Sequence, residues 1–126
     1  MKYDVYMDPE CIKLCDALNE IPGIETTESC CGHGKYRFSV WFKATDLSPL
    51  FIIGRITSRN YMSAPQWKCR VEVIDSDHEN PVRFHLISGK TKGRKAYKQA
   101  DQIADYIHRY VSGDWKWISE KFGVKL

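Results

Sequence analysis

The sequence predicts an α+β fold made of two helix-strand-strand units and C-terminal helices, with a mainly antiparallel sheet. Three segments carry apolar residues at helical spacing, and the runs between them are short and either apolar or alternating, as in strands. Strands that follow one another through short turns pair antiparallel. Helices then cover one or both faces of the sheet. The length of 126 residues suits a single domain over residues 1–126.

The first unit starts with a helix whose N-cap is predicted at Asp8, with Pro9 in its first turn. Cys11, Leu14, Cys15 and Leu18 recur at helical spacing, and Pro22-Gly23 ends the helix. Strands are predicted at residues 24–27 and 36–42.

The second unit repeats this order. A helix is predicted over residues 46–59, a loop over 60–66, a strand over 67–74, a polar turn over 75–81 and a strand over 82–87. The two units therefore form a degenerate repeat.

A third helix is predicted from about residue 94 to 111, with Gly113 as its C′ residue. Asp114 is expected to cap a final short helix that carries Trp115 and Trp117.

Composition indicates a soluble globular protein, with 43% hydrophobic and 28% charged residues. The longest apolar run, residues 50–53, is too short to cross a membrane, and the first residues do not resemble a signal peptide. Five cysteines are an odd number, which argues against a disulfide framework. We therefore expect a cytoplasmic protein with reduced thiols and no membrane partner.

Charge is distributed unevenly. Residues 1–30 hold seven acids and two bases, whereas residues 31–126 hold seventeen bases and nine acids. Residues 89–98 contain five bases and no acid. Such asymmetry can create a positive face that attracts an anionic ligand.

The turn at residues 28–34 is the strongest candidate for a site, because simple hairpins use Asn-Gly, Asp-Gly or Gly-X. A thiolate is a nucleophile, and an imidazole transfers protons near neutral pH. Cys30, Cys31 and His33 are thus the candidate catalytic residues. Candidate ligand-binding residues nearby, through side chains or converging backbone amides, are Ser29, Gly32, Gly34, Lys35 and Arg37. The alternative is that the cysteines fill the core and His33 caps the turn.

A second candidate binding segment follows the last strand, as a basic loop that leads into the third helix. Its Gly-Lys-Thr is not the end of a P-loop, because residue 84 is Phe84 where the motif needs glycine. The N-terminus of a helix with cations around it can still hold a phosphate. The cations in question are Lys90, Lys92, Arg94 and Lys95. The alternative is a solvated basic loop.

No metal site is predicted. Zinc commonly uses paired Cys and His elements, and no second pair matches Cys30-Cys31. Cys11 and Cys15 lie four residues apart on an apolar helix face and are expected in the core. The strand aromatics, Trp41, Trp67 and Phe84, are expected mainly to pack in the core, with His85 on the opposite face of its strand.

The segment from Thr27 to His33 resembles the tRNA wybutosine-synthesising methyltransferase family, which carries a Ser-Cys-Ser-Gly-Arg turn between strands. Ser29, Cys30 and Gly32 match that turn, whereas Cys31 replaces its serine and His33 its arginine. The turn also resembles that of small uncharacterised phage and bacterial proteins with a Cys-Gly-His-Gly loop. The first resemblance implies group transfer to RNA, with S-adenosylmethionine as the cofactor.

Two functions remain open at this point. In the first, the protein binds a nucleotide-like or RNA ligand between the turn and the basic loop, and if it is an enzyme, the resemblance implies RNA modification by group transfer. In the second, the protein is a non-enzymatic interaction protein, as a homodimer, with structural cysteines.

Overall fold

The computed structural model describes residues 7–45, 47–58, 67–73 and 82–114, and its element order confirms the α+β class. Two helix-strand-strand units are followed by a long helix, as the degenerate repeat predicts. The predicted loop at 60–66, the turn at 75–81 and the short helix after Asp114 lie outside the described residues. The elements are α1 (Pro9–Glu20), β1 (Ile24–Cys30), the 3-10 turn η1 (Gly32–Gly34), β2 (Arg37–Ala44), α2 (Ser48–Ser58), β3 (Lys68–Val73), β4 (Val82–Lys92) and α3 (Gly93–Val111).

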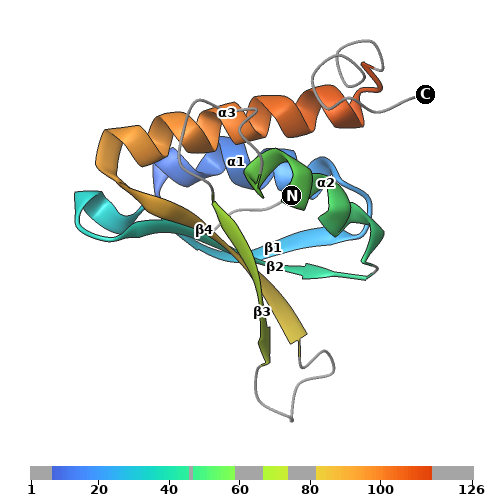
Figure 1. Ribbon diagram of the computed structural model, residues 1–126, viewed down its shortest axis with the longest axis horizontal. Coiled ribbons are helices and arrows are strands. Elements are labelled where there is room, and N and C mark those ends of the chain that lie inside the picture. Colours follow the sequence, from blue (N-terminus) through green and yellow to red (C-terminus); the bar gives the residue numbers. More distant parts are fainter. Residues whose placement is uncertain (1–6, 46, 59–66, 74–81, 115–126) are drawn as a thin grey trace.

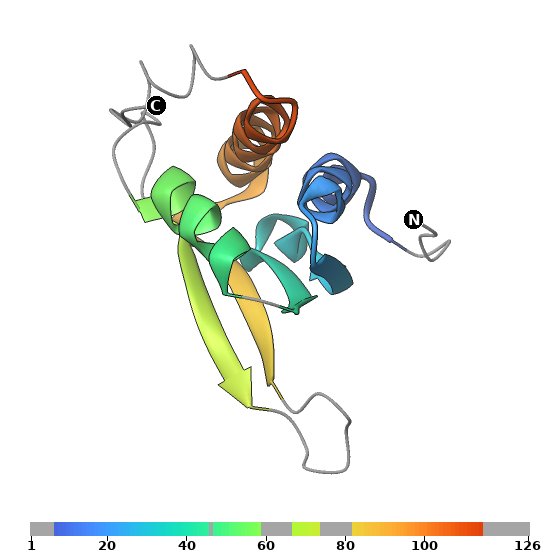
Figure 2. The ribbon, with the colours of Figure 1, turned by 90° about the vertical axis from the view of Figure 1, so that its right-hand side faces the viewer.

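The four strands form one antiparallel sheet in the order β1-β2-β4-β3. Each unit supplies one hairpin, and the second strands of the two hairpins, β2 and β4, pair at the centre of the sheet. The helices lie on one side of this sheet (Figures 1 and 2). The other side is free of helices in the described part of the chain.

Helices α1 and α3 run side by side and in the same direction, so both begin at the same end of the molecule (Figure 1). An ion pair of 3.1 Å joins Lys13 to Asp105 midway along them. Nearer their C-terminal ends, His108 lies 3.0 Å from Glu20. This parallel arrangement places the two helix N-termini, each with its partial positive charge, close to η1.

The core lies between the helices and one face of the sheet. Alternate side chains of β2 are fully buried there, as the period of two in a strand requires. Helix α1 contributes Cys11 and Cys15, both fully buried as predicted. Burial raises the pKa of Cys11 to about 12 and that of Cys15 to about 11, so both remain protonated thiols at neutral pH. The largest fully buried side chains include Phe38, Phe42, Leu14, Leu18, Ile53, Ile56, Leu86, Ile103 and Ile107.

Strand β4 is longer than the sequence predicts, and the predicted basic loop does not exist as a loop. The chain continues as strand through Lys92 and passes directly into α3 at Gly93. The buried hydroxyl of Ser88 explains the extension. The hydroxyl of Ser88 accepts a hydrogen bond from the Phe38 amide and donates one to the carbonyl of Thr91, each 3.0 Å. These bonds connect β2 and β4 at the position where their register shifts, so the two strands remain paired as far as Arg37 and Lys92.

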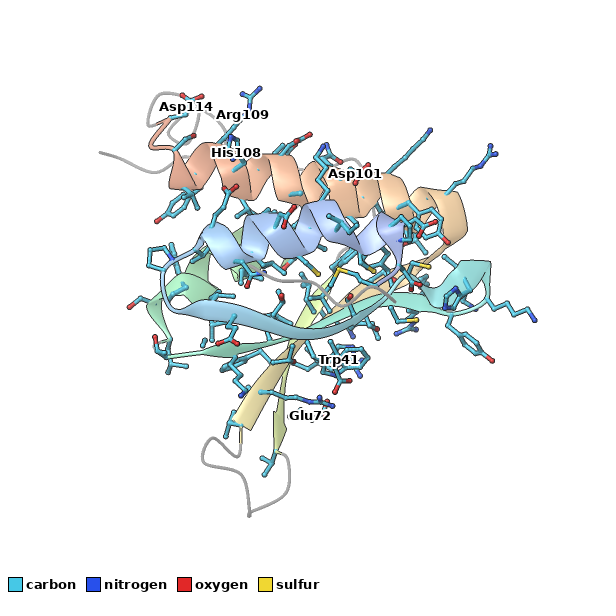
Figure 3. The ribbon with its side chains drawn as sticks, turned by 180° about the vertical axis from the view of Figure 1, so that it is seen from behind. Trp41, Glu72, Asp101, His108, Arg109 and Asp114 are labelled. Atoms are coloured by element: carbon cyan, nitrogen blue, oxygen red, sulfur yellow. The ribbon has the colours of Figure 1, made fainter. Side chains whose placement is uncertain are left out.

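The face of the sheet without helices carries a stack of two rings. Trp41 and His85 are cross-strand neighbours whose ring centroids lie 4.3 Å apart with nearly parallel planes. The indole N–H of Trp41 donates to Glu72 at 3.3 Å, and Figure 3 shows both side chains on the far side of the sheet from the helices. The prediction that His85 lies on the face opposite Phe84 is confirmed. Trp67 and Phe84 are buried as predicted, whereas Trp41 is half-buried.

Among the described residues, no helix combines the length and the apolar character needed to cross a membrane.

Replacing Phe38 by Ala should lower the free energy of unfolding by about 3–5 kcal/mol, because the fully buried ring leaves a cavity between β2 and α3. Urea denaturation followed by circular dichroism measures the change. The matched control is Tyr36→Ala two residues earlier, where the side chain is 70% exposed and the expected loss is within about 0.5 kcal/mol. Equal losses in the two variants would contradict this assignment of the core.

Candidate functional site

The two segments singled out from the sequence meet at one end of the molecule, where η1 lies beside the start of α3 (Figure 1). Arg37, just after the turn, is the cross-strand partner of Lys92. A Cβ atom built on Gly93 would lie 3.8 Å from the Cα of Gly34. The turn and the strand-to-helix junction of β4 and α3 are therefore in direct contact.

The turn has an unusual backbone, with three consecutive residues in the left-handed region. The φ angles are 84° at Gly32, 52° at His33 and 80° at Gly34. The carbonyl of Gly32 accepts hydrogen bonds from the amides of Lys35 and Tyr36, which closes the turn. His33 is the one non-glycine residue with positive φ in the described ranges. This conformation holds its imidazole outside the strand.

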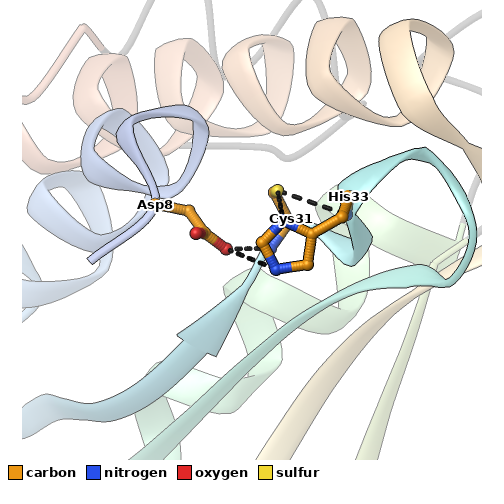
Figure 4. Close-up of side chains that lie close together, drawn as sticks. All are labelled: Asp8, Cys31 and His33. Atoms are coloured by element: carbon orange, nitrogen blue, oxygen red, sulfur yellow. Dashed lines mark hydrogen bonds and ion pairs between the residues drawn. The ribbon is translucent and has the colours of Figure 1, made fainter. Parts of the chain in front are cut away.

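Three side chains from two separate segments gather beside this turn, as Figure 4 shows. Asp8 occupies the N-cap position of α1, as predicted, but its carboxylate does not bond to its own helix. Instead, Asp8 Oδ2 accepts a 2.9 Å hydrogen bond from the amide of Cys31 and lies 3.8 Å from His33 Nε2. The other ring nitrogen, Nδ1, lies 3.7 Å from Cys31 Sγ. The imidazole is thus placed between a carboxylate and a sulfur.

The sulfur of Cys31 is buried, with the residue only 3% exposed, and two donors point at it. The amide of His33 donates at 3.4 Å and the hydroxyl of Tyr97 at 3.7 Å. Burial raises the pKa of the Cys31 thiol, although both donors favour the thiolate. The contact with this sulfur in turn raises the pKa of Tyr97 to about 12. Cys31 is therefore a protonated thiol at neutral pH in the chain by itself.

The amides of the turn bind groups of the chain itself. The Cys31 amide is taken by Asp8, the Gly32 amide donates to Cys30 Sγ at 3.4 Å, and the His33 amide donates to Cys31 Sγ. The predicted anion-binding nest is thus already filled by a carboxylate and two sulfurs at these three amides. External anions must find their donors among nearby side chains and at the start of α3.

Ser29 lies away from the turn. A shift in register between Thr26 and Glu28 turns its side chain toward the core, where its hydroxyl hydrogen-bonds to the thiols of Cys11 and Cys15. The structure does not bring Ser29 together with His33. Cys30, at the end of β1, is half-buried.

Six predicted cations surround the turn and the junction, and all six are exposed. None of them takes part in an ion pair among the residues that the structure describes. The first turn of α3 contains no acid, and its N-cap side chain forms no capping hydrogen bond. Among the described residues these cations outnumber the acids at the start of α1, Asp8 and Glu10, so this end of the molecule carries an excess of positive charge. The six cations are Lys35, Arg37, Lys90, Lys92, Arg94 and Lys95.

Sequence reasoning missed two members of the cluster, Asp8 and Tyr97. Asp8 is 23 residues before Cys31, and Tyr97 is 66 residues after it. Local spacing carries no signal over such separations. The one available hint was the position of Asp8 before a proline-started helix, which indicates a cap and not a partner for the turn.

Comparisons with protein-family models, curated proteins and solved structures each found no match to the chain. The resemblance to the wybutosine-synthesising family therefore stays a prediction.

Gly32→Ala should destabilise the protein more than Gly34→Ala. Both positions have positive φ, which costs an alanine about 1 kcal/mol. At Gly32, however, the new Cβ would also lie 3.0 Å from the backbone carbonyl oxygen of Arg37, whereas space around Gly34 is open. Thermal unfolding of the two variants measures the difference. A Gly34→Ala variant as unstable as Gly32→Ala would contradict the close contact with Arg37.

Proposed function

We propose that the protein binds a nucleotide-like or RNA ligand through its phosphates, at the end where η1 meets the junction of β4 and α3. The observation that carries this proposal is the placement of Arg37 directly opposite Lys92 in the sheet. Like charges directly opposite one another on paired strands are destabilising. An anion bound between them would turn this repulsion into attraction.

The surrounding groups support the same ligand class. Lys35, Arg94 and Lys95 are exposed close to this pair in sequence, and the structure pairs none of them with a described acid. The start of α3 adds the partial positive charge of a helix N-terminus whose N-cap side chain forms no capping hydrogen bond. Phosphate groups are bound in this way in many proteins.

Two described acids at the start of α1, Asp8 and Glu10, offset only part of this charge. Asp8 directs one carboxylate oxygen to the Cys31 amide and to His33, and its side chain is 21% exposed. His33, with a side chain 64% exposed, lies on the outer side of the cluster. His33 is thus the member of the cluster placed to contact a ligand held by the cations. Its role there is that of acid, base or orienting group.

The proposal stops at binding. Group transfer to RNA and S-adenosylmethionine rest on the resemblance over the turn alone, and Ser29 of that turn faces the core. Neither the fold nor the comparisons add support for them.

The double variant Arg37→Gln with Lys92→Gln should weaken binding of a fluorescein-labelled, mixed-sequence single-stranded RNA measured by anisotropy. If each cation contacts one phosphate, the slope of log affinity against log salt should fall by roughly 1.4, at about 0.7 per contact. The matched control is Lys43→Gln with Lys68→Gln, which removes the same charge from two exposed strand positions elsewhere on the sheet.

Unlabelled nucleoside triphosphate added as a competitor distinguishes a nucleotide ligand from RNA in the same assay. Absence of binding at low salt, or an equal loss in the control variant, would argue against this site.

A second function, self-association, is favoured by a different observation. Four large apolar side chains on α2 and β3, and on the residue before α2, are more than half exposed. Strand β3 is also an edge of the sheet, and edges offer unpaired backbone groups to a second chain. The four residues are Leu47, Phe51, Val71 and Val73.

If this surface joins two copies, sedimentation equilibrium should show a dimer that Val73→Lys dissociates, because burying an ammonium group is costly. Val73 is 77% exposed, so the substitution leaves the monomer intact. The control is Ile12→Lys, at a 39% exposed position on α1. A wild-type chain that sediments as a monomer at all concentrations would exclude this function.

A further inference from the structure

We propose that Asp8, Cys31 and His33 form a binding site for a divalent transition metal ion of the zinc type. This inference goes beyond the proposed phosphate site, because it concerns a cation and two residues, Asp8 and Cys31, that the phosphate site does not use; His33 is common to both. The three side chains offer one carboxylate oxygen, one sulfur and one imidazole nitrogen, all within 4.8 Å of one another.

These atoms must approach one another to hold a tetrahedral ion, which can take only one of the two nitrogens of His33. Zinc binds sulfur at about 2.3 Å and nitrogen or oxygen at about 2.0–2.2 Å, so its ligand atoms lie about 3.3–3.7 Å apart. The Sγ atom of Cys31 and Nδ1 of His33 are 3.7 Å apart. Asp8 Oδ2 is held nearby by the 2.9 Å bond from the Cys31 amide.

The backbone holds all three ligands in place before a metal arrives. Asp8 is fixed at the start of α1, and the positive-φ turn fixes the other two. Because Asp8 bonds to the turn and not to its own helix, its carboxylate is available on the side where Cys31 and His33 lie (Figure 4). Such preorganisation lowers the cost of assembling a metal site.

The surroundings of the sulfur suit a metal-bound thiolate. A coordinating cysteine gives up its proton, here to solvent, and carries negative charge that hydrogen bonds stabilise. The amide of His33 and the hydroxyl of Tyr97 already donate to this sulfur. Both donors to the sulfur are in position without any rearrangement of the turn.

A cation can bind at this positive end of the molecule because two of its ligands are anionic. The thiolate and the carboxylate together supply two negative charges, so the site is neutral with a divalent ion bound; because one proton leaves Cys31, binding raises the charge beside Arg37 and Lys92 by one and not by two. Sulfur and imidazole ligands select zinc or cobalt over magnesium and calcium, which require oxygen ligands. Three protein ligands leave one tetrahedral position open for water.

The same cluster is less suited to metal-free thiol catalysis. Cys31 is 3% exposed, so a substrate carbon has little access to its sulfur. A single ion is much smaller than a substrate and reaches the sulfur from the side of the exposed imidazole. The geometry therefore favours coordination over nucleophilic attack by Cys31.

Titration of the reduced, metal-stripped full-length chain with Co²⁺ tests the proposal. Cobalt replaces zinc in sites of this kind and reports a sulfur ligand through thiolate-to-cobalt charge-transfer absorption, with visible bands that mark tetrahedral geometry. The wild type should bind one equivalent and show both features. Addition of Zn²⁺ should abolish them by displacement.

The neighbouring cysteine provides the matched control. Cys31→Ser should remove the charge-transfer band and lower cobalt affinity by more than about 100-fold, beyond the loss typical of a second-shell change. Cys30→Ser should leave both unchanged, because Cys30 does not belong to the cluster. Asp8→Asn and His33→Gln should each weaken binding while circular dichroism confirms the fold. Asparagine keeps an oxygen that accepts from the Cys31 amide.

The proposal fails if no charge-transfer band appears in the wild type, or if Cys30→Ser removes the band and Cys31→Ser keeps it. Its failure is distinct from failure of the phosphate site, because the cobalt spectrum is recorded without RNA. The variant with Arg37→Gln and Lys92→Gln serves as the cross-check: it should keep the cobalt spectrum of the wild type.

Discussion

The pairing of β2 with β4 at the centre of the sheet organises the rest of the molecule. It joins the two hairpins, and its extension through Ser88 and Thr91 carries β4 to Lys92. Because α3 starts immediately after this strand, the same pairing decides where the N-terminus of α3 lies. The positions of the turn, the cations and the parallel helices all follow from this contact between residues about fifty positions apart.

A carboxylate then links α1 to the turn. Asp8, at the start of α1, accepts a hydrogen bond from the amide of Cys31 at the end of β1. The same carboxylate oxygen lies beside the imidazole of His33. The amides of the turn are occupied by this carboxylate and by two sulfurs. The turn is consequently a preorganised cluster of Asp, Cys and His, and the binding of external anions is left to the cations around it.

The six cations and the cluster of Asp8, Cys31 and His33 can bind their ligands side by side. The exposed cations attract phosphates, and the anionic ligands of the cluster neutralise a divalent ion. The two proposals share His33 but otherwise assign different residues to the two ligands, and the cobalt spectrum and the RNA assay test them separately. The apolar surface of α2 and β3 lies on other elements and concerns a different kind of partner.

Sequence alone determined the elements whose signal is local. Period and spacing predicted the apolar stripe of α1 and the burial of Cys11 and Cys15 in the core. They also predicted that His85 lies on the face of the sheet opposite Phe84. Tertiary structure decided what depends on distant partners. The buried hydroxyl of Ser88 extends β4 through the segment predicted as a loop. A register shift in β1 directs Ser29 toward the core. The carboxylate of Asp8 accepts a hydrogen bond from the Cys31 amide, 23 residues away. Local patterns specify which face of an element is buried, but not which remote polar group satisfies its hydrogen bonds.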